Sequence, residues 1–157
     1  MFYINKNSLK NIVVIVYLLG VFYFTLFWRS EGFQLEYQIN LNIIPFYWLI
    51  EPLFMGKDFY LSQVYLNIIL FVPLGFLSGL FSKDISFKKV FITSLCFTLF
   101  IELIQPFFGR CTDIDDVMLN VIGGCLGYSL FTAIKDKILL LHQDFSKAKV
   151  KSQYAVM

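Results

Sequence analysis

Charged residues and histidine are scarce in this sequence. Of its 157 residues, 15% are Asp, Glu, Lys or Arg and one is histidine, whereas 58% are hydrophobic and 19% are aromatic. A soluble domain carries about 25% charged and roughly 45–50% apolar residues. The formal net charge of +2 is too small to indicate binding to nucleic acid. The composition therefore excludes an ordinary soluble domain and predicts an integral membrane protein.

Recognisable sites of catalysis or metal binding are also missing. The three cysteines, Cys96, Cys111 and Cys125, lack the paired spacing of a zinc site, and an odd number implies no disulfide framework. The only histidine, His142, lies near the C-terminus, which argues against a histidine-based site. The sequence contains no Gly-rich phosphate loop and no nucleophile elbow. An enzyme is therefore not the favoured interpretation, and no resident cofactor is expected.

Four runs of the sequence are almost free of charge and long enough to cross a bilayer. A helix needs about 20 mainly apolar residues to span a hydrocarbon core of roughly 30 Å. The fold class expected is all-α, an integral membrane four-helix bundle formed by residues 1–134. Its helices are predicted at about 11–28, 59–82, 90–108 and 114–134.

A shorter apolar segment, at about residues 39–55, lies between the first two runs. It is too short to span and is typical of an interfacial or re-entrant helix. Pro45 can open this helix, over about 45–55, because its fixed φ suits the first turn. Asn42 precedes the helix, and it has either a turn-and-cap role or turns back toward polar groups elsewhere.

Two features of the apolar runs predict helix packing. Asn67 is the one strongly polar side chain of the second run, and it is expected either to hydrogen-bond another helix or to contribute to a site. Pro73 is expected to kink that helix. In the fourth run, Gly123 and Gly127 are four residues apart, a spacing that permits close approach of a neighbouring helix.

The loop cations predict the orientation. The N-terminal lead holds two lysines, the 83–89 turn three and residues 135–157 five, whereas the two other loops hold only Arg29, Lys57 and Arg110. The positive-inside rule counts lysine and arginine in short loops. Both termini are therefore expected in the cytoplasm, with residues 135–157 as a basic cytoplasmic tail.

Polar side chains gather between the third and fourth runs. A carboxylate or guanidinium at membrane depth costs at least about 2.5 kcal/mol, so such groups face a bundle interior, a partner or a wet cavity. A tight loop would bring the polar faces of the third and fourth helices together around Arg110. The polar residues of this stretch are Glu102, Gln105, Arg110, Asp113, Asp115, Asp116 and Asn120.

The acids of this stretch allow several interpretations. They can pair with Arg110, bind a divalent cation through Glu102, Asp113 and Asp116, or act as general acid and base. Asp113, or the threonine before it, can simply cap the fourth helix. Glu102 lies inside the third helix, where no cap explains it, and it is expected to pair with Arg110 or to hydrogen-bond Asn120.

Five motifs in a fixed order resemble the VanZ-like family of bacterial membrane proteins, over most of the chain from the first to the fourth helix. They are NIIPF at 42–46, LNIILFVPLGF at 66–76, IELIQ at 101–105, GRCTDIDDVMLN at 109–120 and GGCLGY at 123–128. The family takes its name from an accessory protein of glycopeptide-resistance clusters, associated with reduced sensitivity to teicoplanin. The residues that match its polar pattern are Asn42, Pro45, Asn67, Pro73, Gly75, Glu102, Gln105, Arg110, Asp113, Asp115, Asp116 and Asn120.

Three functional hypotheses follow. The favoured one is a bacterial cell-membrane protein that binds or handles an amphiphile, such as a lipid-linked cell-wall component or a lipoglycopeptide, at an outward-facing polar site. The functional cluster would consist of Asn42 and Asn67 together with the polar residues between the third and fourth runs, namely Glu102, Gln105, Arg110, Asp113, Asp115, Asp116 and Asn120. The second is a metal-dependent hydrolase or transferase acting on a lipid phosphate, and the third is a purely structural cluster. The sequence leaves the oligomeric state open.

Overall fold

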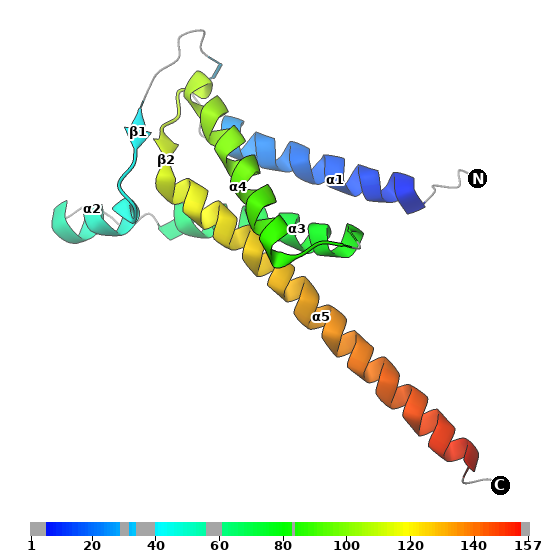
Figure 1. The fold of residues 1–157 in the computed structure, drawn as a ribbon. Helices are drawn as coiled ribbons and strands as arrows, with labels where there is room; N and C mark the ends of the chain where they lie inside the picture. The colour runs from blue at the N-terminus through cyan, green and yellow to red at the C-terminus, as the bar shows by residue number, and fades with distance from the viewer. Residues whose placement is uncertain (1–5, 29–31, 34–39, 56–60, 83, 155–157) are drawn as a thin grey trace.

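The computed structural model describes residues 6–28, 32–33, 40–55, 61–82 and 84–154, with side chains described only between residues 8 and 137. Within these ranges the protein is mostly helical, with two short strands and short connecting turns (Figure 1). The elements are α1 (Lys6–Phe22), η1 (Tyr23–Phe27), β1 (Leu41–Asn42), α2 (Tyr47–Met55), α3 (Leu61–Phe81), α4 (Phe87–Ile104), η2 (Gln105–Phe108), β2 (Thr112–Asp113) and α5 (Ile114–Tyr154).

The four predicted spans are confirmed. In the described part of the chain, four helical segments are long and apolar enough to cross a membrane: Ser8–Phe27, Leu61–Phe81, Phe87–Phe108 and Ile114–Lys137. The first helix begins before residue 11, inside the expected polar lead, and α5 runs on beyond residue 134 as one continuous helix (Figure 1). Residues 59 and 60 of the predicted second span lie outside the described residues, and so do the loop cations Arg29 and Lys57.

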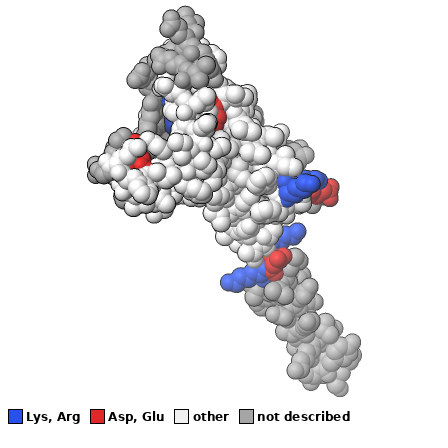
Figure 2. Space-filling view, turned by 60° about the vertical axis from the view of Figure 1, so that its left-hand side comes forward, with Lys and Arg blue, Asp and Glu red and all other residues white. Residues whose placement is uncertain are grey.

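The surface of the spans is apolar. Figure 2 shows charged atoms that are few and separated by a broad uncharged surface. Large hydrophobic side chains such as Val16, Ile69 and Leu126 are more than half exposed. A monomeric soluble protein does not carry so large a contiguous apolar surface. Lipid chains are the environment that this surface fits.

Helices α3 and α5 form the most extensive contact of the bundle, and glycines make it possible. A Cβ atom added at Gly127 would lie 1.9 Å from the carbonyl oxygen of Val72, and one at Gly123 would lie 2.2 Å from that of Ile68. The two backbones therefore touch where the glycine spacing predicted a close approach. Gly75 on α3 is equally tight against the carbonyl oxygen of Gly124, at 1.8 Å.

Helix α4 packs against α5. Helix α1 contacts α3 near its start, where the Lys10 Nζ donates to the Phe81 carbonyl, and further along, where the Tyr17 hydroxyl donates to the Leu70 carbonyl. Ser86 caps the start of α4 by accepting a hydrogen bond from the Lys89 N–H. A buried apolar cluster then joins α1, η1, α3 and α4. It is formed by Val21, Leu26, Phe71 and Ile101.

At its end, α1 widens into a π-helical turn, η1. The Trp28 N–H donates to the Tyr23 carbonyl, five residues back, at 3.1 Å. A π turn is one residue longer than an α turn and is frequent at functional sites. It leaves the carbonyl of Thr25 pointing at side chains from another helix, as described below.

The short helix predicted at about 45–55 is confirmed as α2, which projects from the bundle beside β1 and β2 (Figure 1). Strand β1 pairs in parallel with β2, with Leu41 opposite Thr112 and Asn42 opposite Asp113. The sequence did not predict this pairing, which fastens the connection between the first two spans to the start of α5. Phe46 has a φ of 61°, an uncommon backbone conformation for a bulky residue.

Candidate functional site

The structure divides the nine predicted site residues into two groups at the same end of the bundle. We call the first the strap group, because it fastens β1 and α2 to α4 and α5. Its members are Asn42, Glu102, Asp113 and Asp115. The second, the cavity group, lines a cavity. Its members are Asn67, Gln105, Arg110, Asp116 and Asn120.

Glu102 belongs to the strap group. Its side chain is 2% exposed, and its Oε2 accepts the Asp113 N–H at 2.9 Å. Thr112 strengthens the junction by donating its hydroxyl to the Glu102 carbonyl at 3.0 Å. The Asn120 amide donates to Thr98 rather than to Glu102, whose carboxyl group accepts from the backbone that leads into α5 and interacts electrostatically with Arg110.

Asp113 caps α5, as the sequence predicted. Its Oδ1 accepts the Asp115 N–H at 2.8 Å and the Asn42 side-chain N–H at 3.1 Å. Partial burial raises the pKa of Asp113 above its usual value, and these hydrogen bonds counteract the rise. Asn42 has both of the roles considered for it, since its Oδ1 also accepts the Ile44 N–H within a turn at 3.2 Å.

Asp115 holds the start of α2. Its Oδ1 accepts the Phe46 N–H at 2.6 Å, and its Oδ2 accepts the Trp48 N–H at 3.3 Å. These donors belong to the first turn of a helix, where N–H groups have no partner within the helix. One buried carboxylate from α5, 4% exposed, thus supplies the cap for a helix nearly seventy residues earlier in the chain.

We expect Asp115→Ala to release α2 while leaving the four spans folded. Each hydrogen bond to a charged acceptor contributes about 1.5–3 kcal/mol, and both bonds of this carboxylate would be lost. Hydrogen exchange followed by mass spectrometry should show faster exchange at Phe46 and Trp48 but not in α4. Asp84→Ala, which removes an exposed acid from the α3–α4 turn, is the matched control. Unchanged exchange at both amides would contradict this role of Asp115.

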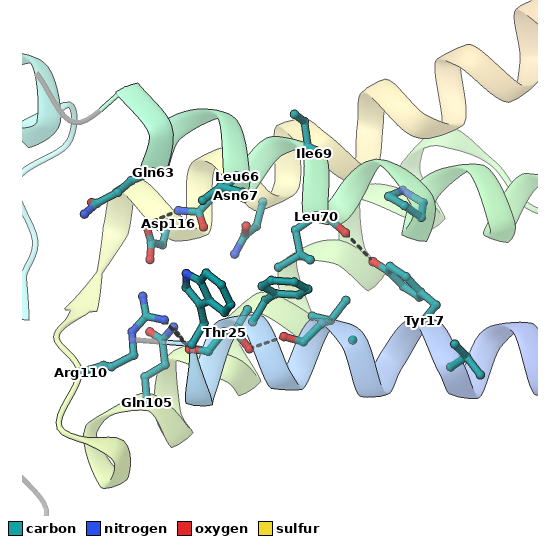
Figure 3. Close-up of a pocket in the computed structure, with 17 residues that line it drawn as sticks. Tyr17, Thr25, Gln63, Leu66, Asn67, Ile69, Leu70, Gln105, Arg110 and Asp116 are labelled. Carbon is teal, nitrogen blue, oxygen red and sulfur yellow. Dashed lines mark hydrogen bonds between the residues drawn. The ribbon is translucent and has the colours of Figure 1, made fainter. Parts of the chain in front are cut away.

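The cavity lies between α1 with η1 on one side and α3 on the other, and it has a volume of about 380 Å³. Figure 3 shows Gln105, Arg110, Asn67 and Asp116 gathered at one end of it, while Leu70 and Tyr17 lie toward the other. The apolar walls are formed by residues of α1, η1 and α3. They include Val16, Val21, Phe24, Leu66, Ile69 and Leu70.

The polar end is organised by the π turn. The Thr25 carbonyl accepts hydrogen bonds from the Arg110 guanidinium, at 2.5 Å, and from the Gln105 side-chain amide, at 3.3 Å. Gln105 is the first residue of η2, and Arg110 follows the end of η2, which Gly109 closes in a left-handed conformation with φ of 69°. Glycine adopts this left-handed conformation without strain. The conformation turns the chain so that Arg110 faces the end of α1.

Helix α3 contributes through Asn67, which donates a hydrogen bond from its side-chain amide to Asp116 Oδ1. This contact joins α3 to α5, so Asn67 both links helices and lines the cavity. Arg110 and Asp116 carry opposite charges that interact across the cavity's polar end. Deeper in the bundle, the Asn120 amide donates to the Thr98 hydroxyl at 2.8 Å. Among the residues that the structure describes, the polar end thus holds one cation, Arg110, and one anion, Asp116, with the amides of Asn67 and Gln105.

The divalent-cation set considered from the sequence is not assembled. Across residues 6–28, 32–33, 40–55, 61–82 and 84–154, no group of three or more His, Cys, Asp and Glu side chains is placed to hold a metal ion. Glu102 and Asp113 belong to the strap group, whereas Asp116 lines the cavity. Cys111 is exposed, and desolvation together with the nearby Asp113 carboxylate raises the pKa of its thiol.

Several residues of the site could not be selected from the sequence. Thr25 stands alone in a long apolar run, where a single threonine is unremarkable, and its contribution is a backbone carbonyl. Thr98 and Ser94 are fully buried on α4, four residues apart. That spacing is a signal for a polar stripe on one helix face, and it runs on to Glu102.

Comparison with known proteins places the chain in a family. A family model described as VanZ/LLP1 matches residues 14–135. Protein VanZ of Enterococcus faecium is 33% identical over 124 residues, which cover 73% of this chain and 71% of that protein. No solved structure matches the chain. Together with its four membrane-spanning helices, these matches show that the chain is a bacterial membrane protein that belongs to the VanZ/LLP1 family.

Proposed function

We propose that this protein binds an amphiphile in the cavity between α1 and α3 and thereby contributes to glycopeptide resistance, teicoplanin being the drug to test. The observation that carries the proposal is the polarity of the cavity, which is charged and hydrogen-bonding at one end and apolar along its walls. An amphiphile has the same division. Its head would meet Arg110 and Asp116, and its chain would lie along α1 and α3.

The dimensions support this proposal. Ligand pockets of proteins have volumes of about 300–1,000 Å³ and combine apolar walls with a few placed polar groups. The cavity falls within that range. It would hold the head and the first part of the chain of a lipid, or the acyl part of a lipoglycopeptide. Exposed residues of α3 on its rim, such as Leu66 and Ile69, would let the remaining chain continue into the bilayer.

The distribution of loop cations supports an outward-facing site. The polar end of the cavity lies where η1, η2 and β2 meet, at the end of the spans opposite the 83–89 turn. The lysines of that turn and of residues 135–157 favour the cytoplasm by the positive-inside rule. We therefore place both termini in the cytoplasm and the polar end near the outer headgroups, where cell-wall intermediates and glycopeptides are present.

Family membership supports the resistance role, because the family takes its name from an accessory protein of glycopeptide-resistance clusters. A binding function accounts for such a role without catalysis. A protein that occupies or withdraws a lipid-linked cell-wall component, or the acyl chain of a lipoglycopeptide, reduces the number of drug molecules that reach their target. The acids of the site then serve to hold a head group and to fasten the strap.

Arg110→Ala is expected to abolish the resistance that the wild-type chain confers. Removing the guanidinium takes away the only cation among the residues that line the described cavity and its bond to the Thr25 carbonyl. The chain would be expressed in a susceptible Gram-positive host, and the minimal inhibitory concentration of teicoplanin measured at equal membrane abundance. The expected value for the variant is that of the empty vector.

The control is Lys135→Ala, which removes an exposed cation from the far part of α5 and should leave the resistance unchanged. Arg110→Lys tests geometry, because lysine keeps the charge but loses the planar fork of guanidinium donors. Full resistance in Arg110→Ala, with membrane abundance equal to the wild type, would overturn the proposed function.

A further inference from the structure

Two buried amide oxygens at the cavity have no hydrogen-bond partner among the described residues: Gln105 Oε1 and Asn120 Oδ1. Both residues line the cavity, and the side chain of each is 2% exposed. Buried polar atoms are nearly always hydrogen-bonded, so each exception requires an explanation. A head group that donates hydrogen bonds would supply the missing partners.

The nitrogen atoms of both amides are engaged in the structure. Gln105 donates to the Thr25 carbonyl, and a carbonyl can only accept, so the glutamine nitrogen must lie on that side. Asn120 donates to the Thr98 hydroxyl. What each amide leaves without a partner is therefore its oxygen, which is an acceptor. Acceptors recognise O–H and N–H groups, not phosphate or carboxylate oxygens.

The charges of the cavity lead to a related conclusion. Arg110 and Asp116 both line the polar end and offset each other. Arg110 has already committed one N–H to Thr25, and Asp116 accepts from Asn67. A head group with a net charge would be opposed by one of the two ions. A neutral head rich in hydroxyl groups would offer hydrogen-bond donors to the two amide oxygens and to the Asp116 carboxylate.

We infer that the amphiphile of this site carries a neutral, sugar-like head whose hydroxyl groups donate to Gln105 and Asn120. This inference rests on the proposed function and specifies its ligand class. Protein sites built to hydrogen-bond a hydroxyl discriminate strongly against analogues that lack it, because their buried acceptors are then left unpaired. The donors of the head, rather than its charge or its chain, should decide binding.

The test uses the full chain purified in detergent and three lipids with identical acyl chains. Glucosyl-diacylglycerol is neutral and has hydroxyl donors, its fully O-methylated derivative is neutral without donors, and phosphatidylmethanol is anionic without donors. Selective binding raises the melting temperature by mass action. We expect glucosyl-diacylglycerol to raise the melting temperature. The methylated lipid and phosphatidylmethanol should each bind at least tenfold more weakly.

Two variants locate the effect. Gln105→Met and Asn120→Leu keep the size of the side chain and remove the whole amide, both the unpaired oxygen and the N–H that donates to Thr25 or Thr98. Each should reduce the affinity for glucosyl-diacylglycerol about tenfold or more. Ser129→Ala, far along α5 with its hydroxyl bonded to the Cys125 carbonyl, is the control. Should a variant fail to fold, the comparison of the two sugar lipids on the wild-type chain still decides the question.

The outcomes separate this inference from the proposed function. Preference for glucosyl-diacylglycerol over its methylated derivative supports both. A shift with phosphatidylmethanol alone, lost in Arg110→Ala, overturns the sugar-like head but leaves an amphiphile site. Equal shifts with all three lipids, or a shift with none, overturn the inference and the selective cavity together.

Discussion

Gly127→Ala is expected to destabilise the bundle by about 3 kcal/mol or more, the upper end of the cost of overpacking a well-packed core. The added Cβ would lie 1.9 Å from the Val72 carbonyl oxygen and 3.0 Å from the Phe76 nitrogen. These are backbone atoms of a regular helix, so no side chain can rotate away. Either α3 and α5 separate along their whole contact, or the hydrogen bonds of α3 are disturbed.

Gly20→Ala provides the matched control, since it makes the same change in a helix where no atom lies within 4 Å of the new Cβ. Alanine has the better helix propensity, by about 1 kcal/mol in water, so this variant should be neutral or slightly more stable. Reversible unfolding in mixed micelles would measure both. Equal free energies of unfolding for the two variants would show that α3 and α5 do not pack as described.

Glu102→Ala is expected to cost about 3 kcal/mol and to loosen the entire strap. The substitution leaves the buried Asp113 N–H without its acceptor and opens a cavity in the bundle, and each of these effects costs roughly 1–3 kcal/mol. The loss of stability should spread from α4 into β1 and α2, because β2 pairs with β1 and leads directly into α5.

Glu102→Gln separates the loss of the hydrogen bond from a change of the carboxyl group. Glutamine keeps the size of the side chain and an acceptor oxygen for the Asp113 N–H, so it leaves neither a cavity nor an unpaired donor. The glutamine variant should therefore lose less than half of what the alanine variant loses. Neither substitution should alter the lipid preference of the folded protein, because Glu102 is not among the residues that line the cavity. A changed preference at unchanged stability would move Glu102 from the strap group to the cavity group.

The spans and their packing could be predicted because lipid leaves few alternatives. An uncharged run must be helical to satisfy its backbone, and glycines four residues apart have few other uses in such a run. The close approach of a neighbouring helix at Gly123 and Gly127 follows from these two rules, which do not identify the neighbour as α3. The short helix after Pro45 was predictable for the same reason, since its apolar run is too short to span.

The division of the polar cluster into two groups could not be predicted. The acids Asp113, Asp115 and Asp116 lie within four residues, yet they contact a strand, the start of α2 and α3 respectively. Sequence spacing places them on a helix start but does not say which distant backbone reaches each carboxylate. Strands of two residues leave no periodic pattern, so the β1–β2 pairing that sorts the acids was beyond sequence reasoning.

The π turn at η1 has a consequence for how relatives of this chain are compared. It accommodates one residue more than an α-helical turn of the same length, so the residues before and after it are related by a shifted register. A relative with an uninterrupted first helix would align with a one-residue gap between Tyr23 and Trp28. Such a gap would mark the loss of the widened turn that presents the Thr25 carbonyl to Arg110, and with it a differently built binding end, even where every polar side chain is retained.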